Sequence, residues 1–389
     1  MSLRRFVLQQ LAAVAVALIA LAVVDQVFVA VFPARGPAES PGGPLSRYMA
    51  DWSLPEAEAL FARAIGNPGQ VVLFGSSELS SSYGNEPFRF FPERRGVPLL
   101  AVGGGGAQSL TILTVLLRHQ EKIGPQSRIV VMLSPWWFLN PGSEAGAVRR
   151  FTPPGALSKI YFDREIAMEH KRPLEVFARE KMHQINPPPI ELALYRYAFL
   201  RTPVVEEIVR FARVTLPEFV RKHSRVYRER WPQHFVFDES VNSAEAVDWP
   251  TELEEWKKKN LEHSRSNPFG FADSSWPDFK GTVPRDLKEP ASVRTELHDL
   301  EVLAEFLSSR GANVLFVMQP LNALAYQKLE RLDSVKRDVA AIFVKNKMSY
   351  VDFLSRPYEK EMLIDLAHPS SYGWAMINLE VENWLRGLK

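Results

Sequence analysis

Three short apolar runs, each followed by glycine or serine, most constrain what this chain can fold into. They cover residues 71–74, 98–102 and 128–133. Short apolar runs of this kind are typical of strands that are covered on both faces in a parallel sheet. A helix-like stretch at residues 108–121 separates the second run from the third. The pattern therefore predicts a βαβ unit and an α/β fold with a mainly parallel sheet.

The same alternation returns near the carboxyl end. It predicts helices over residues 293–309, 328–347 and 372–385, with strands over residues 313–317 and 350–353. Residues 141–290 interrupt it with many prolines and aromatics, and helix-like stretches lie at residues 190–200 and 204–227. We therefore expect a sheet built from both ends of the chain, in one domain over residues 47–389 with a large, mostly helical insertion at about residues 141–290.

The first 46 residues indicate a membrane anchor and a linker. Between residues 6 and 32 only four side chains are polar. A helix of this length would rise about 40 Å, enough to cross a bilayer core. Arg4 and Arg5 precede it, which places the following domain outside the cytoplasm. We predict a single-pass anchor over residues 1–32 and a Pro/Gly/Ser-rich linker over residues 33–46, with a cleaved signal peptide as the alternative.

Composition excludes several classes of function. The chain has no cysteine, which excludes thiol nucleophiles, thiolate metal sites and disulfides. Its net charge of +2 is too small to indicate a nucleic-acid partner. No His-Glu-x-x-His or similar ligand spacing is present, so no metal is expected. The glycine loop at residues 103–106 lacks the Walker lysine and the spacing of a dinucleotide loop, so no nucleotide cofactor is expected either.

The first candidate catalytic motif follows the first predicted strand. Ser76 and Ser77 come directly after Gly75 and before Glu78. A serine at the carboxyl end of a parallel strand lies where open α/β sheets bind ligands, but its hydroxyl needs a base to become a nucleophile. The alternative is that one of these serines only caps the following helix.

The second motif contains the candidate base. Asp365 precedes His368 by three residues, ahead of the last predicted helix. The carboxylate can accept a hydrogen bond from one imidazole nitrogen and leave the other free to act as a base. The alternative is a surface histidine beside a helix that is capped by Ser370 or Ser371.

The remaining candidates follow the second and third predicted strands. Backbone amides in the glycine loop at residues 103–106, with Gly104 and Gly105 at its centre, could hold an anion, although a tight turn explains the glycines equally well. Trp136 and Trp137 follow the third strand, where they form either a substrate wall or a packed rim.

Together these motifs resemble the SGNH, or GDSL-type, hydrolase superfamily. Within it, the segment Phe74–Leu79, the Ser-Pro-x-Trp-Phe motif at residues 134–138, and Asp365-x-x-His368 behind an amino-terminal anchor resemble the DltD family of D-alanyl transfer proteins. The resemblance implies a flavodoxin-like, three-layer α/β/α core. It also implies a triad of Ser77, His368 and Asp365, since Gly75-Ser76-Ser77 aligns with Gly-Asp-Ser.

The resemblance also implies a function. The protein would transfer the acyl group of D-alanyl esters, through an acyl-serine, to a teichoic-acid-like or other anionic polymer of the cell envelope. Its partner would be a membrane-bound O-acyltransferase. The superfamily's Gly-x-Asn-Asp block is missing, so the oxyanion donors are expected among Ser76, Ser77, Gly104 and Gly105. Two alternatives are a non-catalytic tethered adaptor and an O-acetyl esterase or acetyltransferase that acts on an exported polysaccharide.

Overall fold

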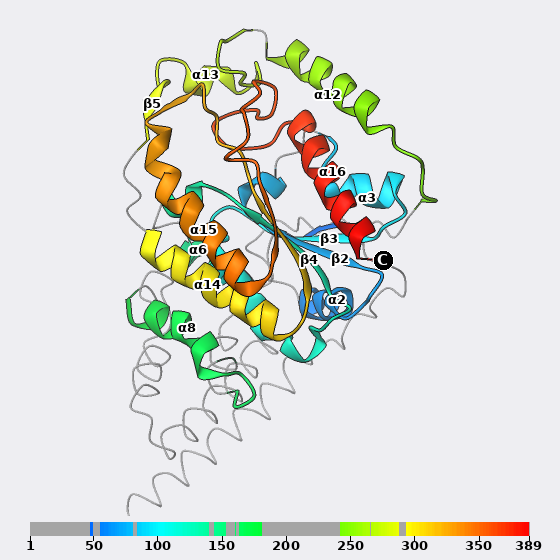
Figure 1. Cartoon of the computed structure of the whole chain (residues 1–389), viewed down its shortest axis with the longest axis vertical. Helices are drawn as coiled ribbons and strands as arrows, with labels where there is room; N and C mark the ends of the chain where they lie inside the picture. The colour runs from blue at the N-terminus through cyan, green and yellow to red at the C-terminus, as the bar shows by residue number, and fades with distance from the viewer. Residues whose placement is uncertain are drawn as a thin grey trace, which may run out of the picture.

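The apolar runs of the sequence are the central strands of a parallel sheet in the computed structural model (Figure 1). The structure describes residues 47–49, 55–80, 84–139, 144–152, 160, 163–180, 242–264, 266–287 and 293–388. The strands of this sheet are β1 (Arg47–Met49), β2 (Val71–Gly75), β3 (Leu99–Gly103), β4 (Arg128–Leu133), β6 (Asn313–Met318) and β8 (Ser349–Asp352).

The sheet has the order β1-β3-β2-β4-β6-β8, and every neighbouring pair is parallel. All carboxyl ends therefore lie along one edge. From β2 the chain first adds β3 on one side and then β4 on the other, so the winding direction changes at β2. Ligands of open α/β sheets bind at the carboxyl edge beside such a switch point.

Helices cover both faces of the sheet. The helices are α2 (Pro55–Ile65), α3 (Pro87–Arg94), α4 (Ser109–Leu117), α5 (Trp136–Leu139), α6 (Glu144–Phe151), α8 (Met168–Glu180), α12 (Trp249–His263), α13 (Trp276–Phe279), α14 (Val293–Ser309), α15 (Asp333–Asn346) and α16 (Ser371–Gly387). Short 3-10 turns are η1 (Ser77–Ser80), η2 (Gln120–Lys122) and η6 (Leu329–Leu332), and β5 (Arg285–Asp286) pairs with β7 (Tyr326–Gln327) in a small second sheet.

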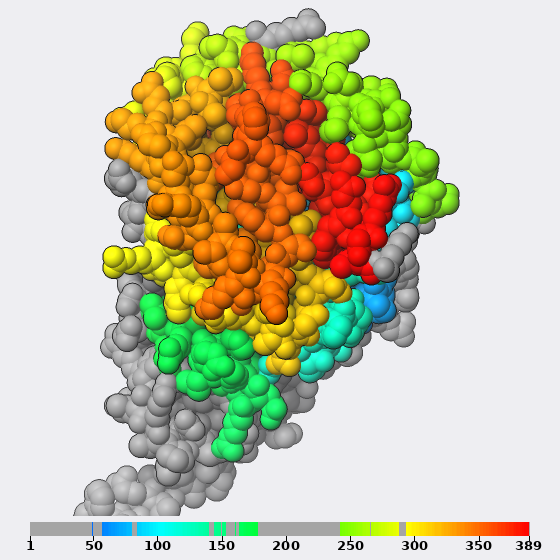
Figure 2. Space-filling view, in the orientation of Figure 1, coloured from blue at the N-terminus to red at the C-terminus, as the bar shows by residue number. Residues whose placement is uncertain are grey.

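Two apolar cores lie on opposite faces of the sheet. Val72 and Phe74 of β2 pack with residues of α2, α4, α14 and α15. Val71 and Leu73, the alternate residues of the same strand, pack with residues of α3, α12 and α16. Successive strand side chains point to opposite faces, so a strand between two cores must be apolar throughout. Figure 2 shows α12 and α16 side by side at the surface, where they pack against each other.

Most predicted elements are confirmed. The five predicted strands are β2, β3, β4, β6 and β8, and the predicted helices at residues 293–309 and 372–385 are α14 and α16. The helix predicted over residues 108–121 ends earlier, at Leu117, and is followed by η2. The helix predicted over residues 328–347 begins as η6 before continuing as α15. The edge strand β1 and the helices α2 and α3 were not predicted.

Several predictions concern residues that the structure does not describe. The anchor at residues 1–32, the linker at residues 33–46 and the helical stretches at residues 190–200 and 204–227 all lie outside the described ranges. Among the described residues, no helix combines the length and the apolar character needed to cross a bilayer.

Candidate active site

The two serines of the first motif lie at the carboxyl end of β2. β2 ends at Gly75, and the 3-10 turn η1 begins at Ser77. The backbone N–H of Ser76 donates to Glu78 Oε1 over 2.6 Å, so the side chain of Glu78 folds back over the turn. Ser76 is buried, and its hydroxyl lies 3.5 Å from the carbonyl oxygen of Gly104.

Ser77, His368 and Asp365 form a continuous hydrogen-bonded relay. Ser77 Oγ lies 2.8 Å from His368 Nε2, although the two residues are 291 positions apart. His368 Nδ1 lies 2.7 Å from Asp365 Oδ2. Because a carboxylate only accepts, it places the ring proton on Nδ1 and leaves Nε2 to accept from the serine hydroxyl.

A closed loop holds Asp365 and His368 together. Asp365 Oδ1 accepts from the backbone N–H groups of Ala367 and His368, both at 2.9 Å, while Oδ2 bonds the ring. The N–H of Ile364 donates to the carbonyl of His368 over 2.9 Å and closes the base of the loop. Ser370 then caps α16, because its hydroxyl accepts from the N–H of Gly373 at 3.0 Å. The carboxylate orients the imidazole and also folds the loop that carries it.

Asn322, just beyond the end of β6, anchors this loop to the rest of the fold. Its side-chain nitrogen donates to the carbonyls of Asp365, at 3.1 Å, and of Phe269, at 3.0 Å. Its backbone N–H donates to the carbonyl of Leu366 over 3.2 Å. Asn322 is fully buried, so these bonds are shielded from water. The sequence interpretation missed this residue, and its only signal is a polar side chain shortly after a buried strand.

The relay shifts the pKa values of both titratable members. Burial acts to lower the pKa of His368, but the hydrogen bond and charge of Asp365, aided by the charge of Glu78, outweigh it and raise that pKa above 6.5. Burial acts to raise the pKa of Asp365, but its bonds to His368 and to two backbone amides lower it below 3.8. Side-chain exposures of 32% for His368 and 15% for Asp365 leave the imidazole accessible and the carboxylate shielded.

The glycine loop lies against the serine turn. A side chain at Gly103 would place its Cβ 1.9 Å from the carbonyl oxygen of Gly75, so only glycine fits where β2 and β3 end side by side. A Cβ built at Gly105 would lie 4.0 Å from that of Ser77. Arg150 of α6 donates to the carbonyl oxygen of Gly105. The loop therefore lies next to Ser77, and Arg150 holds the carbonyl group of Gly105.

A cavity of about 310 Å³ opens beside the relay. Its walls include Ser77 and His368, the loop residues Gly106 and Gln108, and the aromatic side chains of Trp136, Trp137 and Phe279. Trp136 packs edge-on against Tyr326 with ring centroids 5.9 Å apart, whereas Trp137 is buried in the core. Trp136 is thus a partly exposed wall, and Trp137 is mainly a packing residue with one side at the cavity.

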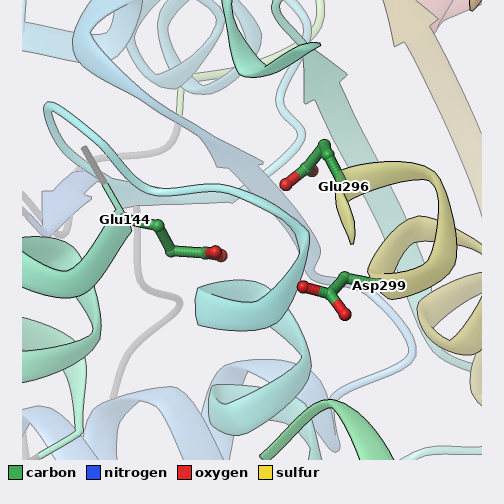
Figure 3. A group of neighbouring side chains, drawn as sticks. All are labelled: Glu144, Glu296 and Asp299. Atoms are coloured by element: carbon green, nitrogen blue, oxygen red, sulfur yellow. The ribbon is translucent and has the colours of Figure 1, made fainter. Parts of the chain in front are cut away.

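One group of acidic side chains among the described residues has the proximity needed for a metal site. Glu144 of α6 and Glu296 and Asp299 of α14 point toward one another, with carboxylate oxygens within 4.8 Å (Figure 3). Glu296 Oε1 accepts from both the N–H and the hydroxyl of Ser109, and Glu144 Oε1 accepts from the N–H of Thr111. These bonds place the group at the start of α4, where carboxylates satisfy helix N–H groups. Glu144 and Glu296 are therefore accounted for as acceptors of N–H groups at the start of α4.

The sequence model of the family described as DltD protein matches residues 55–386, which include the whole relay. Protein DltD of Staphylococcus aureus is 22% identical over 337 residues, covering 81% of this chain and 81% of that protein. Protein DltD of Bacillus subtilis is 23% identical over 345 residues, covering 82% of this chain and 83% of that protein.

Proposed function

The chain belongs to the DltD family, and we propose that it is a membrane-anchored, extracytoplasmic serine acyltransferase or esterase with an SGNH-hydrolase-like fold. The observation that carries the proposal is the relay from Ser77 Oγ to His368 Nε2, at 2.8 Å, and from His368 Nδ1 to Asp365, at 2.7 Å. It couples an alcohol to an oriented base beside a cavity, which is the arrangement that nucleophilic acyl transfer requires.

The reaction begins with acylation of Ser77. Its oxygen attacks the carbonyl carbon of an ester, and its proton passes to His368 Nε2 while Asp365 stabilises the imidazolium. When the tetrahedral intermediate collapses, the ester C–O bond breaks and the departing oxygen takes the proton back from Nε2. A polymer hydroxyl, or water, then resolves the acyl-serine by the same steps in reverse.

The oxyanion would be stabilised by backbone N–H groups of the serine turn and the glycine loop. The close approach of Gly105 to Ser77 supports this assignment, with Gly104 as its neighbour in the loop. The backbone N–H of Ser76, which the sequence offered as a further donor, is already bonded to Glu78 and does not contribute. One such donor typically contributes about 2.7–4 kcal/mol to lowering the barrier. Trp136 would line the path of the acyl donor, because it is the partly exposed aromatic of the cavity wall.

The substrate assignment rests on family membership. We propose that the acyl group is D-alanyl, that the acceptor is a teichoic-acid-like or other anionic polymer of the cell envelope, and that a membrane-bound O-acyltransferase is the partner. Residues 1–32 would anchor the chain and residues 33–46 would link the anchor to the α/β domain. No cofactor enters this scheme, because the serine itself carries the acyl group.

Labelling with a fluorophosphonate probe tests the catalytic proposal. We expect the full-length protein in membranes to be labelled, Ser77→Ala to lose all label, and His368→Ala to react at least about 1,000-fold more slowly. His298→Ala, on the exposed side of α14, is the control for replacing a histidine. Ser76→Ala separates the two serines, since label that disappears with Ser76 and persists in Ser77→Ala would contradict the assignment.

The two alternatives predict different outcomes. A folded, membrane-inserted protein that never labels would be the non-catalytic adaptor. A labelled protein whose acyl-serine forms from acetyl donors and not from D-alanyl donors would be the O-acetyl esterase or acetyltransferase. Mass spectrometry of the peptide that contains Ser77 distinguishes the two acyl groups by mass.

A further inference from the structure

A second carboxylate lies at the relay, and the mechanism above does not use it. Glu78 follows Ser77 directly, and only 2% of its surface is exposed. It contributes to the wall of the cavity that also contains Ser77 and His368. Buried glutamates are uncommon unless their charge is compensated. Two features of the surrounding structure account for this one.

The first feature is a hydrogen bond between Glu78 and the turn that carries Ser77. Glu78 Oε1 accepts from the N–H of Ser76 over 2.6 Å, which fixes the backbone on the amino side of Ser77. The carboxylate also passes directly over the end of β2, since a Cβ built at Gly75 would lie 2.6 Å from Oε1. The glycine in this motif therefore leaves room for the glutamate as well as permitting a tight turn.

The second feature is its charge relative to the imidazole. Burial raises the pKa of Glu78, and the hydrogen bond from Ser76 and the positive charge of His368 act against that rise. In return, the charge of Glu78 adds to that of Asp365 in raising the pKa of His368. Asp365 meets the ring at Nδ1, whereas Glu78 extends from the turn that carries the nucleophile. The imidazolium formed during the reaction is thus near two carboxylates.

We propose that Glu78 is a positioning residue that holds the Ser77 turn in place and stabilises the positive charge that His368 gains when it accepts the serine proton. It exchanges no proton itself: the proton moves from Ser77 Oγ to His368 Nε2. The inference rests on the proposed role of Ser77 as nucleophile.

Glu78→Gln tests the charge separately from the hydrogen bond. The amide oxygen can still accept from the N–H of Ser76, but the negative charge is gone. We expect fluorophosphonate labelling at the high-pH plateau to slow by about tenfold, which corresponds to roughly 1.4 kcal/mol in the barrier. We also expect the acid limb of the pH–rate profile to move to lower pH, because the imidazolium has lost a stabilising charge.

Glu86→Gln is the matched control. Glu86 is also fully buried, and its Oε1 accepts from the N–H of Gly84, two residues earlier, over 3.0 Å. It repeats the local arrangement of Glu78, but its charge does not contribute to the pKa shift of His368. Its variant should therefore leave the position of the acid limb unchanged.

The position of the acid limb decides the outcome. A purely structural glutamate would slow labelling without moving it, so an unchanged inflection in folded Glu78→Gln overturns the proposal. If that variant does not fold, Glu78→Asp replaces it: the charge is kept, so the inflection must stay at its wild-type position, and an inflection at lower pH overturns the proposal. Absence of label on the wild-type protein would instead contradict the assignment of Ser77.

Discussion

At the scale of single residues, the protonation state of His368 controls the proposed chemistry. The ring must be neutral to accept the serine proton, and the carboxylate of Asp365 makes it more basic by favouring the charged form. The same carboxylate accepts two backbone N–H bonds, so its replacement would disturb both the charge and the loop.

The pH dependence of acylation follows from this balance. The pKa of His368 lies above 6.5 in the folded protein, so we expect the labelling rate to fall as pH decreases, with an inflection above 6.5. Asp365→Asn should move that inflection to lower pH and slow labelling at the plateau by about 10⁴-fold, as the corresponding change does in serine proteases. Labelling rates measured from about pH 5 to 9 give both the inflection and the plateau rate. An inflection at the same pH in Asp365→Asn and in wild type would contradict the relay.

At the scale of elements, the start of α4 determines where the glycine loop ends. Every residue of α4 is buried, and its first turn meets carboxylates from two other helices, Glu144 of α6 and Glu296 of α14. Burial, followed by the charges of Glu144 and Asp299, raises the pKa of Glu296 well above 4.5. A carboxyl group in this setting favours its protonated form, which reduces repulsion within the group.

This cluster predicts a pH-dependent stability. Because the pKa of Glu296 is higher in the folded than in the unfolded chain, the folded state binds more protons, and stability falls as pH rises above 4.5. Glu296→Gln retains an oxygen acceptor for Ser109 and cannot ionise. Its free energy of unfolding relative to wild type should therefore increase between about pH 5 and 8 in urea titrations.

Glu301→Gln is the control for that measurement. Glu301 lies on the same helix, is 36% exposed and pairs with Lys345 at the surface. The free energy of unfolding of Glu301→Gln relative to wild type should vary little over the same pH range. A constant difference for Glu296→Gln would mean that the carboxyl group does not carry a raised pKa.

At the scale of the whole molecule, the parallel sheet brings the site together. Ser77 follows β2, the glycine loop follows β3, Trp136 follows β4, and Asn322 lies beyond β6. The loop with His368 comes between β8 and α16. Parallel strands place all of these segments at one edge, although β4 and β6 are separated in sequence by residues 134–312.

Removal of residues 1–46 tests the proposed division of the chain. All strands of the main sheet and all members of the relay lie at or beyond Arg47. We expect the full chain to sediment with membranes and the shortened chain to remain in the supernatant, with fluorophosphonate labelling of Ser77 retained. A shortened chain that still sediments with membranes after high-salt washing would contradict the anchor.

The sequence by itself determined the central strands, the helices α14 and α16 and the order of the motifs. These are local properties: an apolar run between two cores, a glycine at the end of a strand and a carboxylate three residues before a histidine can each be read within a few positions. The same locality explains why Ser370 was already a candidate helix cap, since its partner Gly373 is three residues away.

Only the tertiary structure decided which distant groups meet. The edge strand β1 is three residues long and carries too little pattern to be read, and the links of Asn322 to Asp365 and of Glu296 to Ser109 join segments far apart in sequence. The position of Glu78 over the end of β2 depends on the path of the backbone at Gly75. Its proximity to the site depends on a fold that brings His368 to Ser77 across 291 positions of the chain. Hydrogen bonds and charge interactions act over a few ångströms in space, whatever the distance along the chain, so their partners are set by packing.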